Sequence, residues 1–239
     1  MRAAAGAPAP PPALIPFVYS YVELSRGSGA AGFILALASL APVAVLVSLC
    51  TLLASRRDLA TAALLAGQIV NEALNHALKY AARVPRPTPS LHPAFDEQSP
   101  YAWPSDHAQF AAFTAAYICR WAPRRWAVGA RAHAATRAAA LAAAALVCAS
   151  RVALGYHTRA QVAAGAAVGA AAGALWFEFV EAALRPRFAA LAATPLARAL
   201  LIRDATHVRD VLAVEYAATL AARAGKAADA PAGARDDAV

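Results

Sequence analysis

Residues 32–54 read GFILALASLAPVAVLVSLCTLLA, a run of 23 residues with no charged side chain. A helix needs about 20 predominantly apolar residues to cross the hydrocarbon core of a membrane. The uncharged stretch extends from Gly27 to Ser55, so it is long enough to span. The sequence therefore predicts a transmembrane helix here and an integral membrane protein.

The composition of the 239 residues agrees with a membrane protein. Apolar residues make up 60% of the chain and charged residues 15%, and the mean hydropathy is +0.47. Soluble domains are about 45–50% apolar and about 25% charged, and disordered chains are more polar still, so both classes are disfavoured. The net charge of +8 is compatible with nucleic acid or anionic lipid. Its placement, described below, favours the membrane, and no nucleic-acid partner is expected.

Four further helical runs follow the first one. They cover about 59–82, 104–121, 133–153 and 161–183, and the last three are dominated by alanine. The run 59–82 begins apolar and then carries Asn71, Glu72, Asn75, His76 and Lys79. Polar groups at membrane depth need a protein partner or water. We expect an all-α bundle of about five transmembrane helices.

The segment Gly165–Gly173, GAAVGAAAG, places glycines at intervals of four residues. This spacing lets two helices approach closely in a membrane. The alternative is a composition bias that fills the helix with small residues and has no role in packing. Both interpretations remain open at the level of the sequence.

The chain divides into three predicted parts. Residues 1–30 form an N-terminal segment that breaks into prolines before any apolar core of a signal peptide, so no cleaved leader is expected. Residues 31–184 form the transmembrane domain. Residues 185–239 form a tail, in which 196–226 predicts one or two amphipathic helices at the membrane surface and the end is frayed.

The arginines predict how the bundle is oriented, because cytoplasmic loops carry an excess of Lys and Arg. Three basic groups fall on one side of a five-span arrangement: Arg56 and Arg57; Arg120, Arg124, Arg125, Arg131 and Arg137; and Arg185, Arg187 and Arg198. That side is predicted to be cytosolic. The opposite side receives the N-terminus and the loops 85–103 and 151–160.

Three polar clusters lie where the second, third and fourth runs reach the non-cytosolic side. They are KYAARVPRP at 79–87, WPSDH at 103–107 and SRVALGYH at 150–157. The cationic groups of Lys79, Arg86 and Arg151 can converge on a dianion, since guanidinium forks match phosphate oxygens. Ser105 is placed to cap a helix whose first free N–H groups form a natural anion site.

Two histidines, His107 and His157, complete the set. A neutral imidazole can attack phosphorus while a protonated one donates to the leaving oxygen. No spacing of Asp, Glu, His and Cys predicts a metal cage, and no cofactor is expected. Singly, each residue has an ordinary explanation as a helix-end cation, a helix cap or a structural imidazole. Their joint occurrence at one membrane face favours a phosphate site.

With these residues the chain resembles the type 2 phosphatidic acid phosphatase (PAP2) superfamily, whose signature is Lys-x6-Arg-Pro, Pro-Ser-Gly-His and Ser-Arg-x5-His-x3-Asp. The matching segments are Lys79 to Arg86-Pro87, Pro104-Ser105-Asp106-His107, and Ser150-Arg151 to His157. The dolichyl diphosphate phosphatase branch is more similar still. Its features include Asn71-Glu72 with Asn75, Ala108-Gln109-Phe110, Tyr156-His157-Thr158 and Gln161-Val162, within a resemblance from about residue 20 to 225.

The resemblance implies a helical bundle of the PAP2/acid phosphatase type and a hydrolase that needs no metal. By it, His157 would be the nucleophile that forms a phosphohistidine, and His107 would protonate the leaving lipid phosphate and then activate water. The groups that would hold the phosphoryl group and spread its transition-state charge are Lys79, Arg86, Ser105 and Arg151. The implied reaction converts dolichyl diphosphate to dolichyl phosphate at the lumenal face of the endoplasmic reticulum membrane, for protein N-glycosylation.

The chain departs from the superfamily signature at Gln161, where most members carry an Asp that orients the nucleophilic histidine. The dolichyl diphosphatase branch is similar to this chain in having Gln there. A neutral amide can offer only its oxygen to an imidazole N–H. One hypothesis is that Glu72 supplies the missing carboxylate, and the alternative is that Glu72 pairs with Lys79.

The second departure is Asp106, where the signature has Gly. We expect its backbone N–H to contact phosphate, so its carboxylate should point away or pair with Arg86 or Arg151. That interpretation predicts that Asp106→Gly keeps activity. The alternative is an impaired site.

Other functions fit part of the pattern. A broader lipid phosphatase would act on phosphatidic acid or isoprenyl diphosphates. A non-catalytic membrane scaffold would keep the signature as a relic, and a lipid-binding protein would use the basic cytosolic loops. The two histidines and three cations of the signature, all present, argue against a relic.

Overall fold

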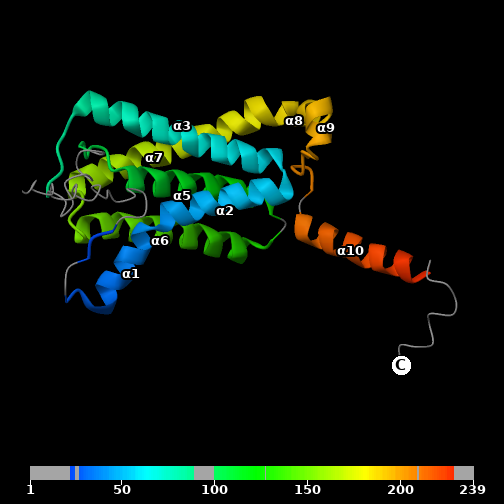
Figure 1. The fold of residues 1–239 in the computed structure, drawn as a ribbon, viewed down its shortest axis with the longest axis horizontal. Helices are drawn as coiled ribbons and strands as arrows, with labels where there is room; N and C mark the ends of the chain where they lie inside the picture. The colour runs from blue at the N-terminus through cyan, green and yellow to red at the C-terminus, as the bar shows by residue number, and fades with distance from the viewer. Residues whose placement is uncertain (1–21, 25–26, 89–99, 127, 209, 229–239) are drawn as a thin grey trace, which may run out of the picture.

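The computed structural model describes residues 22–24, 27–88, 100–126, 128–208 and 210–228. These parts form helices and isolated bridges but no strands, which confirms the predicted all-α fold. The long helices lie side by side in a bundle (Figure 1). In chain order the elements are α1 (Gly29–Ser39), α2 (Ala41–Arg56), α3 (Leu59–Ala82), α5 (Asp106–Arg125), α6 (Ala130–Ala153), α7 (Arg159–Phe179), the π-helical turn η1 (Val180–Leu184), α8 (Arg185–Ala192), α9 (Pro195–Ala199) and α10 (Val211–Ala228).

The first predicted span is broken in two. Helices α1 and α2 meet with a bend of 41°, and only as a pair are they long and apolar enough to cross a membrane. Pro42, in the first turn of α2, lacks the N–H that would continue the preceding helix. Two other helices are long and apolar enough on their own, namely α6 and the continuous helix Arg159–Ala192 that joins α7, η1 and α8.

Helices α3 and α5 are too polar to meet the same test. Their polar side chains are accommodated because they face one another inside the bundle. Gln109 of α5 is fully buried, and its Oε1 accepts a hydrogen bond of 2.8 Å from Asn75 Nδ2. Its Nε2 donates at 2.9 Å to both the Oδ1 and the main-chain oxygen of Asn71. The predicted need of these residues for protein partners is confirmed, while the number of five spans stays a prediction.

The glycines of α7 form the seam between α7 and α5. A Cβ atom at Gly165, Gly169 or Gly173 would overlap the main-chain oxygen of Ser105, Gln109 or Phe113, respectively. The two helices therefore touch backbone to backbone over three successive turns, which only glycine permits. This resolves the alternatives left by the sequence, since packing requires small residues at these three positions.

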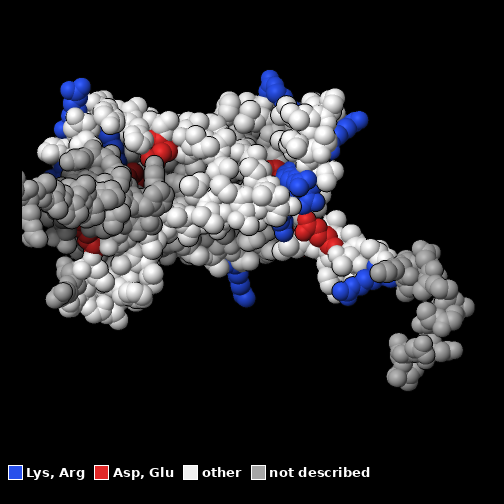
Figure 2. Space-filling model, viewed as in Figure 1, with Lys and Arg blue, Asp and Glu red and all other residues white. Residues whose placement is uncertain are grey.

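The two ends of the bundle carry different features. The C-terminal end of α3, the start of α5 and the connection between α6 and α7 lie at one end, and the α2–α3 turn lies at the other with α8 and α9 (Figure 1). Figure 2 shows that the side of the bundle in view is largely uncharged across its middle. Charged groups gather toward the ends, as expected of a bundle whose middle faces hydrocarbon.

The segment after α9 binds to the α2–α3 turn. Leu59 N donates to Arg203 O at 3.1 Å, and Arg203 N donates to Arg57 O at 2.9 Å. The carboxylate of Asp58 accepts from Ala205 N at 3.1 Å. Helix α10 then extends away from the bundle (Figure 1).

Candidate active site

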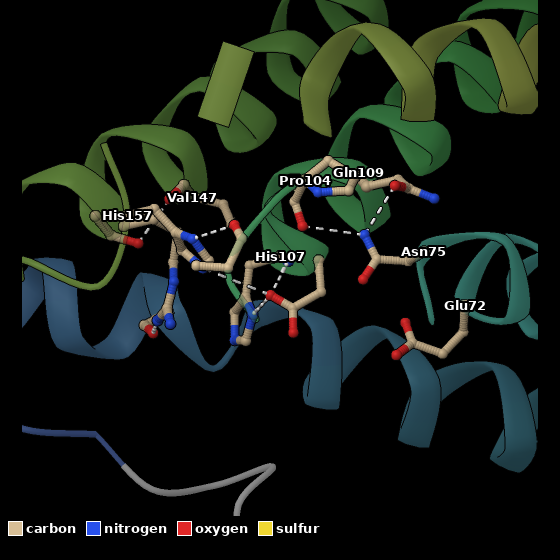
Figure 3. Close-up of polar contacts among 12 residues, drawn as sticks. Glu72, Asn75, Pro104, His107, Gln109, Val147 and His157 are labelled. Carbon is tan, nitrogen blue, oxygen red and sulfur yellow. Dashed lines mark hydrogen bonds and ion pairs between the residues drawn. The ribbon is translucent and has the colours of Figure 1, made fainter. Parts of the chain in front are cut away.

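The three sequence clusters meet around the carboxylate of Asp106, at the first turn of α5. Figure 3 labels two members of the site, His107 and His157. Lys79 Nζ lies 3.1 Å from Asp106 Oδ2, and His107 Nδ1 lies 2.9 Å from Asp106 Oδ1. His157 Nε2 lies 3.9 Å from the same Oδ1. The structure thus brings residues of α3, of α5 and of the α6–α7 connection into one site, as the sequence predicts.

A short turn places His157 in this site. Helix α6 ends at Ala153, and Gly155 follows with φ +78°, a backbone conformation that favours glycine. The main-chain N–H of His157 donates back to Arg151 O at 3.1 Å. Thr158 then caps the next helix, α7. The histidine is therefore held between two helix ends and not on a free loop.

The hydrogen bonds of His157 fix its tautomer. Its Nδ1 lies 3.0 Å from the carbonyl oxygen of Ala102. Because a carbonyl oxygen only accepts, Nδ1 carries the proton and Nε2 keeps its lone pair. Nε2 is buried and has no hydrogen-bond partner among the described residues. The site therefore presents an imidazole lone pair that is shielded and ready to attack.

The surroundings of His157 keep this imidazole neutral. Burial is the main cause that lowers its pKa, from 6.5 to about 3. Asp106 acts against this, whereas the positive charges of Arg151, Arg86 and Lys79 add to it. A neutral imidazole is the nucleophilic form, so the site favours the form that can react.

Neither Gln161 nor Glu72 orients His157. Gln161 Oε1 accepts from Thr158 N at 2.9 Å, and its Nε2 donates to Pro85 O at 3.5 Å, so the side chain completes a capping box of α7. Glu72 pairs with His76 at 3.5 Å, and Lys79 pairs with Asp106. Both the hypothesis that Glu72 replaces the signature Asp and the alternative of a Glu72–Lys79 pair are wrong. The Ala102 carbonyl has the orienting role.

The carboxylate of Asp106 also differs from expectation. It pairs with Lys79 and His107 in place of Arg86 or Arg151, and it accepts from the main-chain N–H of His107 at 2.8 Å. It therefore points into the site rather than away from it. The prediction that Asp106→Gly keeps activity assumed a carboxylate that points away or pairs with Arg86 or Arg151, and the structure shows neither arrangement.

Two further predicted ligands present buried atoms without partners. Ser105 is the N-cap residue of α5, but its side chain makes no capping bond, and its buried Oγ has no partner within the described part of the chain. Arg151 Nε is likewise buried and has no hydrogen-bond partner among these residues. Unpaired buried polar atoms are rare in proteins, so a site with Ser105 Oγ, Arg151 Nε and His157 Nε2 unpaired is suited to a ligand. A tetrahedral anion would accept hydrogen bonds from Ser105 Oγ and Arg151 Nε, and its central atom would be the electrophile that His157 Nε2 attacks.

Asp106 Oδ1 lies 3.9 Å from His157 Nε2, the nitrogen that such an anion would have to approach. We expect Asp106→Asn to tighten inhibition by inorganic vanadate or phosphate on the order of tenfold, because the entering anion no longer meets a negative charge. The inhibition constant measured during turnover checks this. Glu72→Gln is the matched control, since it removes a nearby carboxylate whose ion-pair partner, within the described part of the chain, is His76. Equal vanadate affinity in wild type and Asp106→Asn would contradict the placement.

Sequence reasoning assigned no role in the site to three groups that help to build it. Ala102 acts through its main-chain oxygen, so its side chain gives no signal. The ring of Tyr156 lies 4.0 Å from Arg151 Cζ, a cation–π contact. Ser39 Oγ accepts from Arg151 Nη1 at 2.5 Å. Ser39 and Ser48 lie in the same apolar run, and nothing in the sequence distinguishes the two.

Among the described residues no group of three or more His, Cys, Asp and Glu side chains could hold a metal ion. The site instead gathers two histidines, two cations and a hydroxyl around one carboxylate. Such a set suits phosphate binding and phosphoryl transfer.

Comparison with known proteins places this site in a family. The family model described as "PAP2 superfamily" matches residues 60–185. Dolichyldiphosphatase 1 of Homo sapiens is 34% identical over 213 residues, which cover 86% of this chain and 88% of the relative. Lipid phosphate phosphatase gamma of Arabidopsis thaliana is 36% identical over 159 residues, 65% of this chain and 69% of its own length.

Dolichyldiphosphatase of Saccharomyces cerevisiae is 33% identical over 184 residues, which cover 75% of this chain and 76% of the relative. No solved structure matches the chain. The matched region 60–185 contains all three motifs and the site that they form. The chain therefore belongs to the PAP2 superfamily, in the branch that contains these dolichyldiphosphatases.

Proposed function

We propose that this protein is a membrane hydrolase that removes the terminal phosphate of dolichyl diphosphate. The observation that carries the proposal is the way the imidazole of His157 is held. The Ala102 carbonyl holds its proton on Nδ1, and Nε2 is buried and has no hydrogen-bond partner among the residues that the structure describes. The relatives named dolichyldiphosphatases support the substrate class.

In the first step, His157 Nε2 attacks the terminal phosphorus. A nitrogen–phosphorus bond forms, and the bond from phosphorus to the bridging oxygen breaks. His107 donates a proton to that oxygen, which departs as dolichyl phosphate. His107 lies one residue from Asp106, whose Oδ1 accepts from its Nδ1 and so leaves Nε2 to exchange the proton.

In the second step, water attacks the phosphohistidine. His107 takes a proton from the water, the nitrogen–phosphorus bond breaks, and inorganic phosphate leaves with the neutral imidazole restored. The groups that hold the phosphoryl group in both steps are Lys79, Arg86, Ser105 and Arg151. Their positive charge and hydrogen bonds stabilise charge that grows on the phosphoryl oxygens. Lys79 exchanges its bond to Asp106 for one to phosphate.

The proposed location is the endoplasmic reticulum membrane, with residues 31–184 as the catalytic domain and the site on the lumenal side. The support is the placement of the site at the end of the bundle opposite the α2–α3 turn and α8 (Figure 1). That opposite end carries Arg56, Arg57 and Arg185, and basic segments mark the cytosolic side. The tail 185–239 is then cytosolic.

Phosphate release by the detergent-purified full chain, measured in EDTA on a panel of lipids, tests the function. We expect kcat/KM for dolichyl diphosphate to exceed that for phosphatidic acid by about tenfold or more, since a diphosphate offers a better leaving group. A preference for phosphatidic acid would reassign the protein to the broader lipid phosphatases. No release from any lipid phosphate would favour a scaffold.

A further inference from the structure

Arg151 is held in the site by neutral partners. Ser39 Oγ accepts from its Nη1 at 2.5 Å, and the ring of Tyr156 covers its Cζ at 4.0 Å. The side chain is 4% exposed. Among the described residues no carboxylate forms an ion pair with Arg151, and its Nε has no partner. The guanidinium is thus oriented by a hydroxyl and an aromatic ring, with no carboxylate among the described residues bound directly to it.

Ser39 lies where the first span breaks. It is the last residue of α1, and Leu40 separates it from α2, which runs on after the bend of 41°. Helix α1 packs against α6, the helix that carries Arg151. Ser39 itself is 1% exposed. The break thus lies next to the one residue of this span whose hydroxyl contacts the guanidinium among the described residues.

We propose that Ser39 is a positioning residue of the active site, which fixes the guanidinium of Arg151 so that its Nε–H faces the transferred phosphoryl group. The proposal rests on the proposed function. A guanidinium has five N–H donors in a rigid plane, so fixing Nη1 fixes the direction of the others. The hydroxyl is suited to this role because a carboxylate in its place would compete with phosphate for the charge.

Ser39→Ala removes the hydrogen bond and keeps the volume close to that of serine. A hydrogen bond to a charged group contributes enough for kcat to fall about tenfold or more when it is lost. We expect KM to change less than kcat, because the charge of Arg151 acts mainly on the transition state. Ser39→Thr keeps a hydroxyl and should restore part of kcat.

Ser48→Ala is the matched control. Ser48 lies on α2, is exposed, and donates to Ala44 O of its own helix at 2.8 Å, its one side-chain hydrogen bond among the described residues. We expect wild-type kcat in this variant. If Ser39 had a purely structural role, Ser39→Ala would lower the unfolding temperature but would not lower kcat selectively.

The double variant of Ser39→Ala with Arg151→Lys separates positioning from general damage. If Ser39 acts through Arg151, adding Ser39→Ala to Arg151→Lys causes no further loss of kcat beyond that of Arg151→Lys alone. Wild-type kcat in Ser39→Ala, or losses that multiply in the double variant, would overturn the proposal.

Vanadate binding, followed as a shift in unfolding temperature, separates this proposal from the proposed function. If the wild-type chain releases no phosphate from any lipid, the function fails, but Ser39→Ala should still bind vanadate more weakly than Ser48→Ala. Equal vanadate affinity in these two variants would overturn the role of Ser39 by itself.

Discussion

Replacing His157 by asparagine should reduce phosphate release from dolichyl diphosphate on the order of a thousandfold or more, because it removes the nucleophile. The asparagine amide can still donate to the Ala102 carbonyl, which the histidine contacts at 3.0 Å. The turn before α7 should therefore keep its shape. The loss would then reflect chemistry and not folding.

Trapping the intermediate measures this effect directly. Acid-quenched single turnovers with substrate labelled in the terminal phosphate should label wild-type protein and leave His157→Asn unlabelled. His76→Asn is the matched control, since His76 pairs with Glu72 on the exposed face of α3. Phosphate attached to His157→Asn, or a stable label on another residue, would contradict the assignment.

The same residue predicts an effect of pH on stability. Burial lowers the pKa of folded His157 from 6.5 to about 3, so between these values the unfolded chain binds a proton that the folded chain does not. The contribution of His157 to the free energy of unfolding is therefore fully present above about pH 6.5 and is lost as the pH drops toward about 3. Between about pH 7 and about pH 5, the fall in unfolding temperature should be smaller in His157→Asn than in wild type.

Gly169→Val should prevent the protein from folding into a stable bundle. Any Cβ at this position overlaps the main-chain oxygen of Gln109, and a branched side chain adds two more carbons. Gln109 cannot shift freely, because its side chain bonds to Asn71 and Asn75 of α3. Overpacking in a core costs about 1–3 kcal/mol, and contact with rigid main chain belongs to the upper end or beyond.

Ala171→Val provides the control for Gly169→Val. It adds a branched side chain to the same helix at an exposed position, so helix propensity changes while the seam with α5 does not. Size-exclusion profiles and unfolding temperatures in detergent compare the two. A monodisperse, active Gly169→Val protein would contradict the backbone contact between α5 and α7.

The sequence predicts the long helices because membrane insertion depends on residue type. The uncharged run from Gly27 to Ser55 is visible without any tertiary information. Its break depends on geometry as well, and Pro42 is the one local sign of it. The three motifs likewise predict Lys79 and His157 through their chemistry.

Other features of the site could not be predicted, because they depend on how helices lie relative to one another. The partner of Asp106 follows from the placement of α3 beside α5, which brings Lys79 to 3.1 Å. The hydrogen bond to His157 comes from a main-chain oxygen that any residue at position 102 would supply. The glycines of α7 needed the structure to show that main chain lies against them.

The continuous helix Arg159–Ala192 is long and apolar enough to cross a membrane, and we expect it to set the depth of the protein in its bilayer. Between Arg159 and Glu178 there are 18 uncharged residues. At about 1.5 Å of rise per residue they measure about 27 Å, close to the thickness of the endoplasmic reticulum hydrocarbon layer. Hydrophobic matching then allows little vertical sliding. We therefore expect His157, two residues before Arg159, to lie at the level of lipid headgroups, where a lipid diphosphate would reach it by lateral diffusion without leaving its leaflet.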